Sequence, residues 1–269
     1  MLEIAQWKEE LNTYRSIQRM FILEGNVTDK QILTEGIESG ELVDLNEYLY
    51  IYLKTQGYHT IVFFNRIDGF YNIYDDSQQM IHDFYIQAKM KNTSSKIDIQ
   101  TAMNGIREAL GGRDHSVAII IEMSGQLISS AEHLEEDEIE YLSTLLLAIN
   151  EATSAPANNN EGWANNLVFM ITNKVQELPT WFYRYSPYIK VLTLDFPKEK
   201  LRRQIISSYQ DYFSDWNSFD VKAKDKVINQ LVAQTDGFTC IELDSVLDLC
   251  QGETTSIPSR KKGKSMARN

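Results

Sequence analysis

The sequence predicts an α/β fold: a five-stranded parallel sheet with helices on both faces, followed by a small helical domain. Two observations lead to this prediction. Short apolar segments alternate with helical segments over the first 195 residues, and beyond Pro197 only helical periodicity remains. Segment 117–121 (VAIII) contains no polar residue, which is typical of a strand buried on both faces of a parallel sheet. Alternating strands and helices predict right-handed crossovers between parallel strands.

Length and composition narrow the class of protein. The chain has 269 residues, 43% of them apolar, which suffices for an α/β core with a small appended domain. Its net charge of −12 disfavours nucleic acid as a partner. Cys240 and Cys250 form no CxxC pair, and no apolar run approaches the roughly 18–20 residues of a membrane helix. We therefore expect a soluble cytoplasmic protein with no membrane partner.

The expected elements follow from periodicity and from capping signals. Asp44 with Glu47 suits a helix start, and Gly57, Gly111 and Gly237 suit helix ends. Strands are expected at 20–23, 61–64, 117–121, 167–172 and 189–194, and helices at 2–19, 44–55, 77–91, 97–110, 135–151, 199–213, 221–235 and 240–250. These elements predict a core at 1–195 with an N-terminal helix, a helical lid at 196–250, and a flexible basic tail or linker at 251–269.

Three segments carry a resemblance to a known family. Segment 231–243 (LVAQTDGFTCIEL) runs from an apolar helix into Gly237, Phe238 and Thr239, which suit a left-handed turn, a packed aromatic and a helix cap. Segment 194–197 (LDFP) precedes Arg202, and segment 167–173 ends in Asn173. In this order they resemble the lid, the fifth strand and the fourth strand of AAA+ ATPases. The alternatives are an ordinary helix–glycine corner, a strand–proline junction and a turn asparagine.

The resemblance implies a sheet in the order 5-1-4-3-2 and a site for ATP and Mg²⁺. It implies that Asn173 orients the attacking water, and that Arg202 on the first lid helix contacts nucleotide. Asn173 would lie at the carboxyl end of a strand, where α/β sheets bind ligands. Arg184 lies where the family has its arginine finger, or it is a surface arginine within an aromatic cluster.

The first strand is followed by a departure from the family pattern. A working phosphate loop reads G-x-x-x-x-G-K-[ST], so that backbone N–H groups, a lysine and a hydroxyl hold the phosphates and Mg²⁺. This chain has GNVTDKQ at 25–31, with one glycine and with Gln31 after the lysine. Any cofactor binding here would use Gly25, Asn26, Thr28 and Lys30, beside the negative charge of Asp29.

The acidic pair after the third strand is also altered. The family has Asp for Mg²⁺ followed by Glu to activate water, whereas this chain has Glu122 and Met123. Glu122 can face a cation, but a thioether cannot act as a base. No metal site is expected from the four scattered histidines.

The sequence therefore predicts a degenerate AAA+ module, similar to N-terminal modules of Clp-like proteins. Its expected role is assembly or regulation of a larger AAA+ machine, with weak or absent ATP hydrolysis. Its expected partners are other AAA+ modules or further copies of itself, with a protein client possible. Two alternatives stay open: an ATPase with an atypical phosphate loop that uses Lys30, Glu122 and Asn173, and a protein-binding adaptor on an AAA+-like scaffold.

Overall fold

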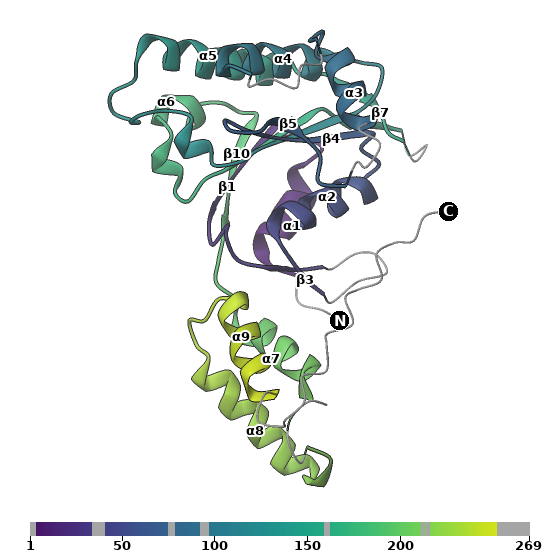
Figure 1. Cartoon of the computed structure of the whole chain (residues 1–269), viewed down its shortest axis with the longest axis vertical. Helices are drawn as coiled ribbons and strands as arrows, with labels where there is room; N and C mark the ends of the chain where they lie inside the picture. Colours follow the sequence, from purple (N-terminus) through teal and green to yellow (C-terminus); the bar gives the residue numbers. More distant parts are fainter. Residues whose placement is uncertain are drawn as a thin grey trace. The chain divides into compact units, whose positions relative to one another are not determined.

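The computed structural model describes residues 4–33, 41–74, 79–91, 97–158, 162–210, 213 and 216–251. They belong to two compact units, which divide between Asp195 and Phe196 (Figure 1). Each unit is described below by itself. No helix in these ranges is long and apolar enough to cross a membrane.

The first unit is built on a central sheet whose strands lie in the order β10-β1-β9-β6-β4-β5 within the described residues. The strands are β1 (Met20–Gly25), β4 (Thr60–Asn65), β5 (Gly69–Tyr71), β6 (Val117–Ile121), β9 (Leu167–Ile171) and β10 (Ile189–Leu194). All adjacent pairs are parallel except β4 with β5. Without β5 the order is 5-1-4-3-2, so the predicted parallel α/β sheet is confirmed.

Strand β5 is an addition to the predicted five strands. It forms because Asn65 organises a tight turn: its Oδ1 accepts hydrogen bonds from the N–H groups of Ile67 at 2.9 Å and Asp68 at 2.8 Å. Gly69 then takes a φ of +74°, which is accessible to glycine without strain. A three-residue strand at the sheet edge carries too little periodicity to be predicted from sequence.

Alternate residues of each strand enter separate hydrophobic layers, as the two-residue period of a strand requires. Ile22, Val62 and Phe64 pack with helices α3 (Gln79–Gln87), α4 (Ile99–Gly111) and α5 (Glu136–Glu151) on one face. Leu23 and Phe63 pack with α1 (Gln6–Tyr14) and α2 (Leu45–Thr55) on the other. Figure 1 shows the two groups of helices on opposite sides of the sheet.

Several short elements lie outside the helices and strands that the sequence predicts. Strands β2 (Gln31–Ile32) and β3 (Leu42–Val43) pair antiparallel, as do β7 (Ser154–Pro156) and β8 (Trp163–Asn165). The turns η1 (Ser124–Gln126) and η2 (Val175–Glu177) follow β6 and β9, and a short helix, α6 (Thr180–Tyr183), leads toward β10. These turns line the edge of the sheet at which the strands end.

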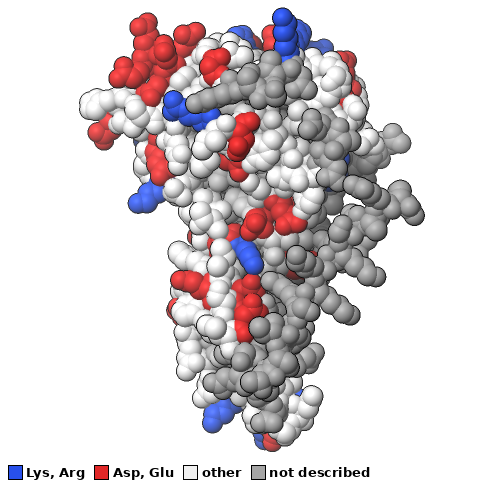
Figure 2. All heavy atoms as spheres, viewed as in Figure 1, with Lys and Arg blue, Asp and Glu red and all other residues white. Residues whose placement is uncertain are grey.

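The surface carries the acidic excess of the sequence. In Figure 2, Asp and Glu side chains gather near helix α5 on the face shown. The first turn of α5 contains Glu136, Asp137 and Glu138, and a capping box joins Glu135 and Glu138. Negative side chains at a helix N-terminus are stabilised by the helix dipole, so this acidic group has a structural reason to be there.

The second unit is helical throughout its described residues. It contains α7 (Glu199–Ser208), the turn η4 (Trp216–Ser218), α8 (Val221–Gln234) and α9 (Cys240–Gln251). Gly237 has a φ of +80° between α8 and α9. Thr239 then caps α9, since its Oγ1 accepts from the N–H of Glu242 at 3.1 Å while the Glu242 carboxylate accepts from the Thr239 N–H at 2.8 Å.

Candidate functional site

A pocket of about 580 Å³ opens at the carboxyl ends of β1, β6 and β9. This edge of a parallel sheet is where α/β proteins bind ligands. The turn after β1 contributes Thr28, the start of α2 contributes Asn46, the end of β6 contributes Glu122, and the end of β9 contributes Asn173. The structure therefore brings four residues from different parts of the sequence together, three of which the sequence predicted as site residues.

The turn after β1 uses its backbone donors within the protein. The N–H of Gly25 donates to the carbonyl of Asn173 at 3.0 Å, and the N–H of Asn26 donates to the carbonyl of Leu194 at 2.8 Å. The N–H of Val27 donates to the carbonyl of Gly25 at 2.8 Å. A phosphate-binding loop works because such N–H groups converge on the anion. These three are directed to protein carbonyls.

Asp29 supplies a negative charge inside the same turn. Its carboxylate is buried and accepts from the side-chain amide of Asn26 and from the N–H of Lys30, both at 2.8 Å. Two further donors of the turn are thus occupied by an internal anion. Lys30 is not among the residues that line the pocket. Its predicted role in cofactor binding, like that of Gly25, Asn26 and Thr28, stays a prediction.

Glu122 is held by neutral donors on three other elements. Its carboxylate accepts from the side-chain amides of Asn46 at 2.5 Å and Asn65 at 3.1 Å, and from the hydroxyl of Tyr71. Burial, and then the hydrogen bond to Glu122, raises the pKa of the Tyr71 phenol, so this hydroxyl remains a donor. Three donors fix the carboxylate in one orientation. Asn46 and Asn65 were missed by sequence reasoning, since nothing in their local sequence marks them.

Met123 occupies the position after Glu122 with an unusual backbone. Its φ of +47° lies in the left-handed region, which costs a residue other than glycine roughly 1–2 kcal/mol. The side chain is 43% exposed and lines the pocket. A thioether can neither accept a proton from water nor bind Mg²⁺ well. The position that would carry a catalytic base therefore carries a soft apolar group.

Asn173 and Arg184 lie in different places. The exposed side chain of Asn173 lines the pocket, while its carbonyl accepts the hydrogen bond from Gly25. Arg184 is exposed at the end of α6 and is not among the lining residues. A residue that acts on a neighbouring subunit need not line its own pocket, so the geometry leaves the arginine-finger prediction untested.

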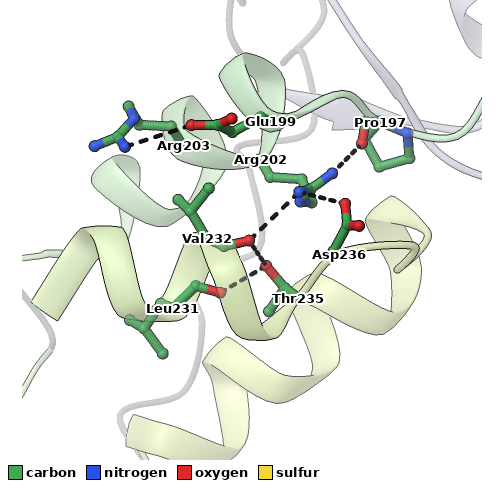
Figure 3. Close-up of polar contacts among 8 residues, drawn as sticks. All are labelled: Pro197, Glu199, Arg202, Arg203, Leu231, Val232, Thr235 and Asp236. Carbon is green, nitrogen blue, oxygen red and sulfur yellow. Dashed lines mark hydrogen bonds and ion pairs between the residues drawn. The ribbon is translucent and has the colours of Figure 1, made fainter.

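Arg202 is a buried residue of the helical unit (Figure 3). Its guanidinium donates to the carbonyl of Pro197 and to the carboxylate of Asp236, both at 2.8 Å, and to the carbonyl of Val232 at 3.4 Å. These bonds tie the start of the unit to the end of α8. Arg202 therefore stabilises the packing of the helical unit. Its contact with nucleotide stays a prediction.

Comparison with known proteins assigns the chain to a family. Residues 3–195 match the family model described as AAA+ chaperone, N-terminal Rossmann-like domain. The chain belongs to this family. No curated protein matches it. Among solved structures, it is similar to a chain in the E. coli MS115-1 HORMA:CdnC:Trip13 complex, with 11% identity over 93% of this chain and 78% of that chain, and a TM-score of 0.44.

Membership of the AAA+ family suggests nucleotide binding in general, so the pocket has to be compared with what ATP and Mg²⁺ require. The triphosphate needs converging N–H donors and a lysine, and Mg²⁺ needs oxygen ligands and phosphate. The turn after β1 directs the N–H groups of Gly25, Asn26 and Val27 to protein carbonyls, and the residues that line the pocket include no lysine or arginine. Mg²⁺ that arrives with ATP needs only one or two protein carboxylates, and both oxygens of Glu122, the carboxylate at the end of β6, are already bonded to Asn46, Asn65 and Tyr71. These residues do not fit ATP·Mg²⁺.

Proposed function

We propose that this chain is a degenerate AAA+ module that serves in the assembly or regulation of a larger AAA+ machine and hydrolyses ATP weakly or not at all. The observation that carries the proposal is the turn after β1. Its N–H groups bond to Asn173, Leu194 and Gly25, and its own Asp29 takes two further donors. Phosphoryl transfer depends almost entirely on positioning and charge stabilisation, so a turn of this kind has lost its contribution.

The fold itself is intact, which supports a role in assembly. The sheet keeps the strand order of the family, and its central strands are fully buried. The substitutions that remove catalytic groups lie at the pocket and leave the core undisturbed. The proposed partners are other AAA+ modules or further copies of this chain in the cytoplasm, with a client protein as a further possible partner.

A steady-state ATPase assay tests the catalytic half of the proposal. The purified chain should hydrolyse ATP negligibly, and Lys30→Ala and Glu122→Gln should change the rate by less than the assay error. The residues that line the pocket include no lysine or arginine for the phosphates, and the carboxylate of Glu122 is already held by three donors, so removing either side chain should remove little that acts on ATP. A turnover above about 0.1 per second, below the ordinary enzyme range, that collapses in either variant would instead establish an ATPase with an atypical phosphate loop.

Sedimentation velocity tests the assembly half. The chain alone, and the chain mixed with an intact AAA+ module from the same source, should sediment as oligomers at micromolar concentration and without nucleotide. A strictly monomeric chain that leaves the other module's sedimentation unchanged would favour the adaptor alternative.

A further inference from the structure

Exposed apolar side chains gather around the turn that joins α1 to β1. They are Ile17 in the turn (58% exposed), Trp163 on β8 (68% exposed) and the exposed Tyr188 before β10. Asn165 shares a face of β8 with Trp163, because side chains alternate along a strand, and it donates to the carbonyl of Ser16 at 2.9 Å. On the other side of the turn, the N–H of Arg19 donates to the carbonyl of Tyr188 at 2.9 Å. The three segments therefore meet at the amino-terminal edge of the sheet.

Two arginines of the same turn give this edge a positive charge. The guanidinium carbon of Arg19 lies 5.6 Å from the ring centroid of Tyr188, and its Nη1 is buried without a hydrogen-bond partner among the described residues. Arg15 lies directly after α1. Neither arginine forms an ion pair within the part of the chain that the structure describes, whereas the neighbouring Lys190 is paired with Glu10 at 2.8 Å. A donor without an acceptor and a charge without a counterion both favour a partner that brings negative charge.

These five residues form what we call the amino-edge patch: Arg15, Ile17, Arg19, Trp163 and Tyr188. Single exposed apolar residues are ordinary on a protein surface, but a group of them from separate segments is typical of an interaction site. Tryptophan, tyrosine and arginine are also the residue types that contribute most to the affinity of protein interfaces. The composition of the patch therefore indicates a protein partner.

The start of α5 has the opposite charge. Segment 132–140 contains six acids, namely Glu132, Glu135, Glu136, Asp137, Glu138 and Glu140, and Figure 2 shows acidic side chains gathered near this helix. None of the six forms an ion pair with another described residue. The helix dipole accounts for the acids of the first turn, but Glu132 and Glu140 lie outside it. Ile139 is exposed among them. An apolar residue surrounded by acids is complementary to an apolar patch flanked by arginines.

We propose that the amino-edge patch of one copy of this chain binds the start of α5 of a second copy. The inference rests on the proposed function, because it names the surfaces through which copies assemble. Strands β1, β9 and β6 are parallel, and the patch precedes β1 whereas α5 follows β6. The two surfaces therefore lie at opposite edges of the sheet, and the contact is head-to-tail. Each copy has a net charge of −12, so copies repel one another over most of their surface, and the pairing of opposite charges selects this contact.

Two double variants test the two surfaces by sedimentation velocity. Ile17→Ser with Trp163→Ser removes the apolar part of the patch, and Glu136→Lys with Glu140→Lys reverses the charge of α5. All four residues are exposed, so both variants should fold, which their Tm values check. Each should raise the Kd of self-association by at least about tenfold, since one loses interface anchors and the other creates like-charge contacts. Ile86→Ser, at an exposed apolar residue on α3, is the control and should leave the Kd unchanged.

An equimolar mixture of the two double variants is the sharpest form of the test. Only one contact remains possible in it: the intact α5 of the patch variant can bind the intact patch of the α5 variant. The mixture should therefore form heterodimers and nothing larger, although each variant alone sediments as a monomer. Oligomers that persist in either variant alone, or a mixture that stays monomeric, would overturn the inference.

The unmodified chain separates this inference from the proposed function. If it forms oligomers that neither double variant weakens, the inference fails while assembly through another surface stands. If it is monomeric at micromolar concentration but joins an intact AAA+ module, the inference also fails and the proposed role in a larger machine stands. If it neither self-associates nor joins that module, both are contradicted.

Discussion

At the scale of single residues, the ability of the site to bind a ligand depends on which of its polar groups are already hydrogen-bonded within the protein. Within the turn after β1, the carboxylate of Asp29 accepts from the side-chain amide of Asn26 and from the backbone N–H of Lys30, both at 2.8 Å. Glu122 is satisfied by Asn46, Asn65 and Tyr71 in the same way. A buried network whose members are satisfied is stable but offers little to a ligand, because each ligand bond would replace an existing one.

Gly25 is required by the backbone at this site. Its φ is +90°, and a Cβ added to it would lie 2.8 Å from the carbonyl oxygen of Leu194. Because that oxygen belongs to the backbone of β10, it cannot move away as a flexible side chain could. Gly162 is a matched control in the same unit, with a φ of +100° and nothing within 4 Å of an added Cβ. Gly162→Ala should lower the free energy of unfolding by about 1–2 kcal/mol through strain alone.

Gly25→Ala should lower the free energy of unfolding by about 1–3 kcal/mol more than Gly162→Ala does. The ends of β1 and β10 must separate to admit the methyl group. Urea unfolding of both variants measures the difference. If both variants lost the same free energy of unfolding, the backbone of β10 at Leu194 would be able to move aside at little cost. Gly25 would then be required for its φ alone.

At the scale of elements, the order of the five parallel strands could be predicted from the sequence, whereas the short antiparallel strands could not. Strands β6 and β9 are apolar at every position, so their burial on both faces followed from sequence. Strands β2, β3, β7 and β8 have two or three residues each, too few for a periodic signal. The residues that hold Glu122 lie 51, 57 and 76 positions away along the chain, and only the fold brings them to it.

The amino-terminal edge of the sheet contains two neighbouring histidines, His59 and His115. His59 precedes β4 and His115 precedes β6, with ring centroids 4.6 Å apart. Burial, and then the charge of His59, lowers the pKa of His115 below 6.5, although Asp83 and Asp114 act in the opposite direction. Its Nε2 is buried without a partner among the described residues. The folded state therefore disfavours the imidazolium form.

The unfolded chain consequently binds this proton more tightly, and the free energy of unfolding should fall as the pH drops below about 6.5. Urea unfolding between pH 8 and pH 5 measures the slope, and His115→Gln should flatten it. His133→Gln, at an exposed histidine, should leave the slope as it is. A slope that His115→Gln does not alter would assign the pH dependence to other groups.

At the scale of the whole molecule, the chain consists of two compact units. The first contains the sheet and the pocket, and the second is helical and is joined internally by Arg202. From the loss of strand periodicity after Pro197, the sequence predicts a core at 1–195 and a helical lid at 196–250. It could not show that the arginine it assigned to nucleotide bonds to Pro197, Val232 and Asp236, since those contacts depend on how the helices pack.

Arg202→Ala should therefore destabilise the helical unit. The substitution removes three hydrogen bonds, one of them an ion pair with Asp236, and takes this donor from the carbonyl of Pro197, while the carbonyl of Val232 keeps its bond from the hydroxyl of Thr235. The loss should cost about 2–3 kcal/mol. Hydrogen exchange should speed up across α7, α8 and α9 while the sheet retains its protection. Arg203→Ala is the control, because the half-buried Arg203 makes its contacts with Asn229 and Glu199 at the surface. Unchanged exchange in Arg202→Ala would leave nucleotide contact as the better explanation for this arginine.

The central claim, that the pocket of this AAA+ module does not take ATP, is tested most directly by thermal unfolding in the presence of ATP·Mg²⁺. A ligand at 100 times its Kd adds about 2.7 kcal/mol to the stability of the folded state, which shifts the Tm by several degrees in a domain of this size. The engaged N–H groups of the turn after β1, and a lining whose only charged residues are Asp44, Glu122 and Glu177, predict no shift at millimolar ATP·Mg²⁺. A saturable rise of several degrees, reduced in Glu122→Gln, would contradict the account.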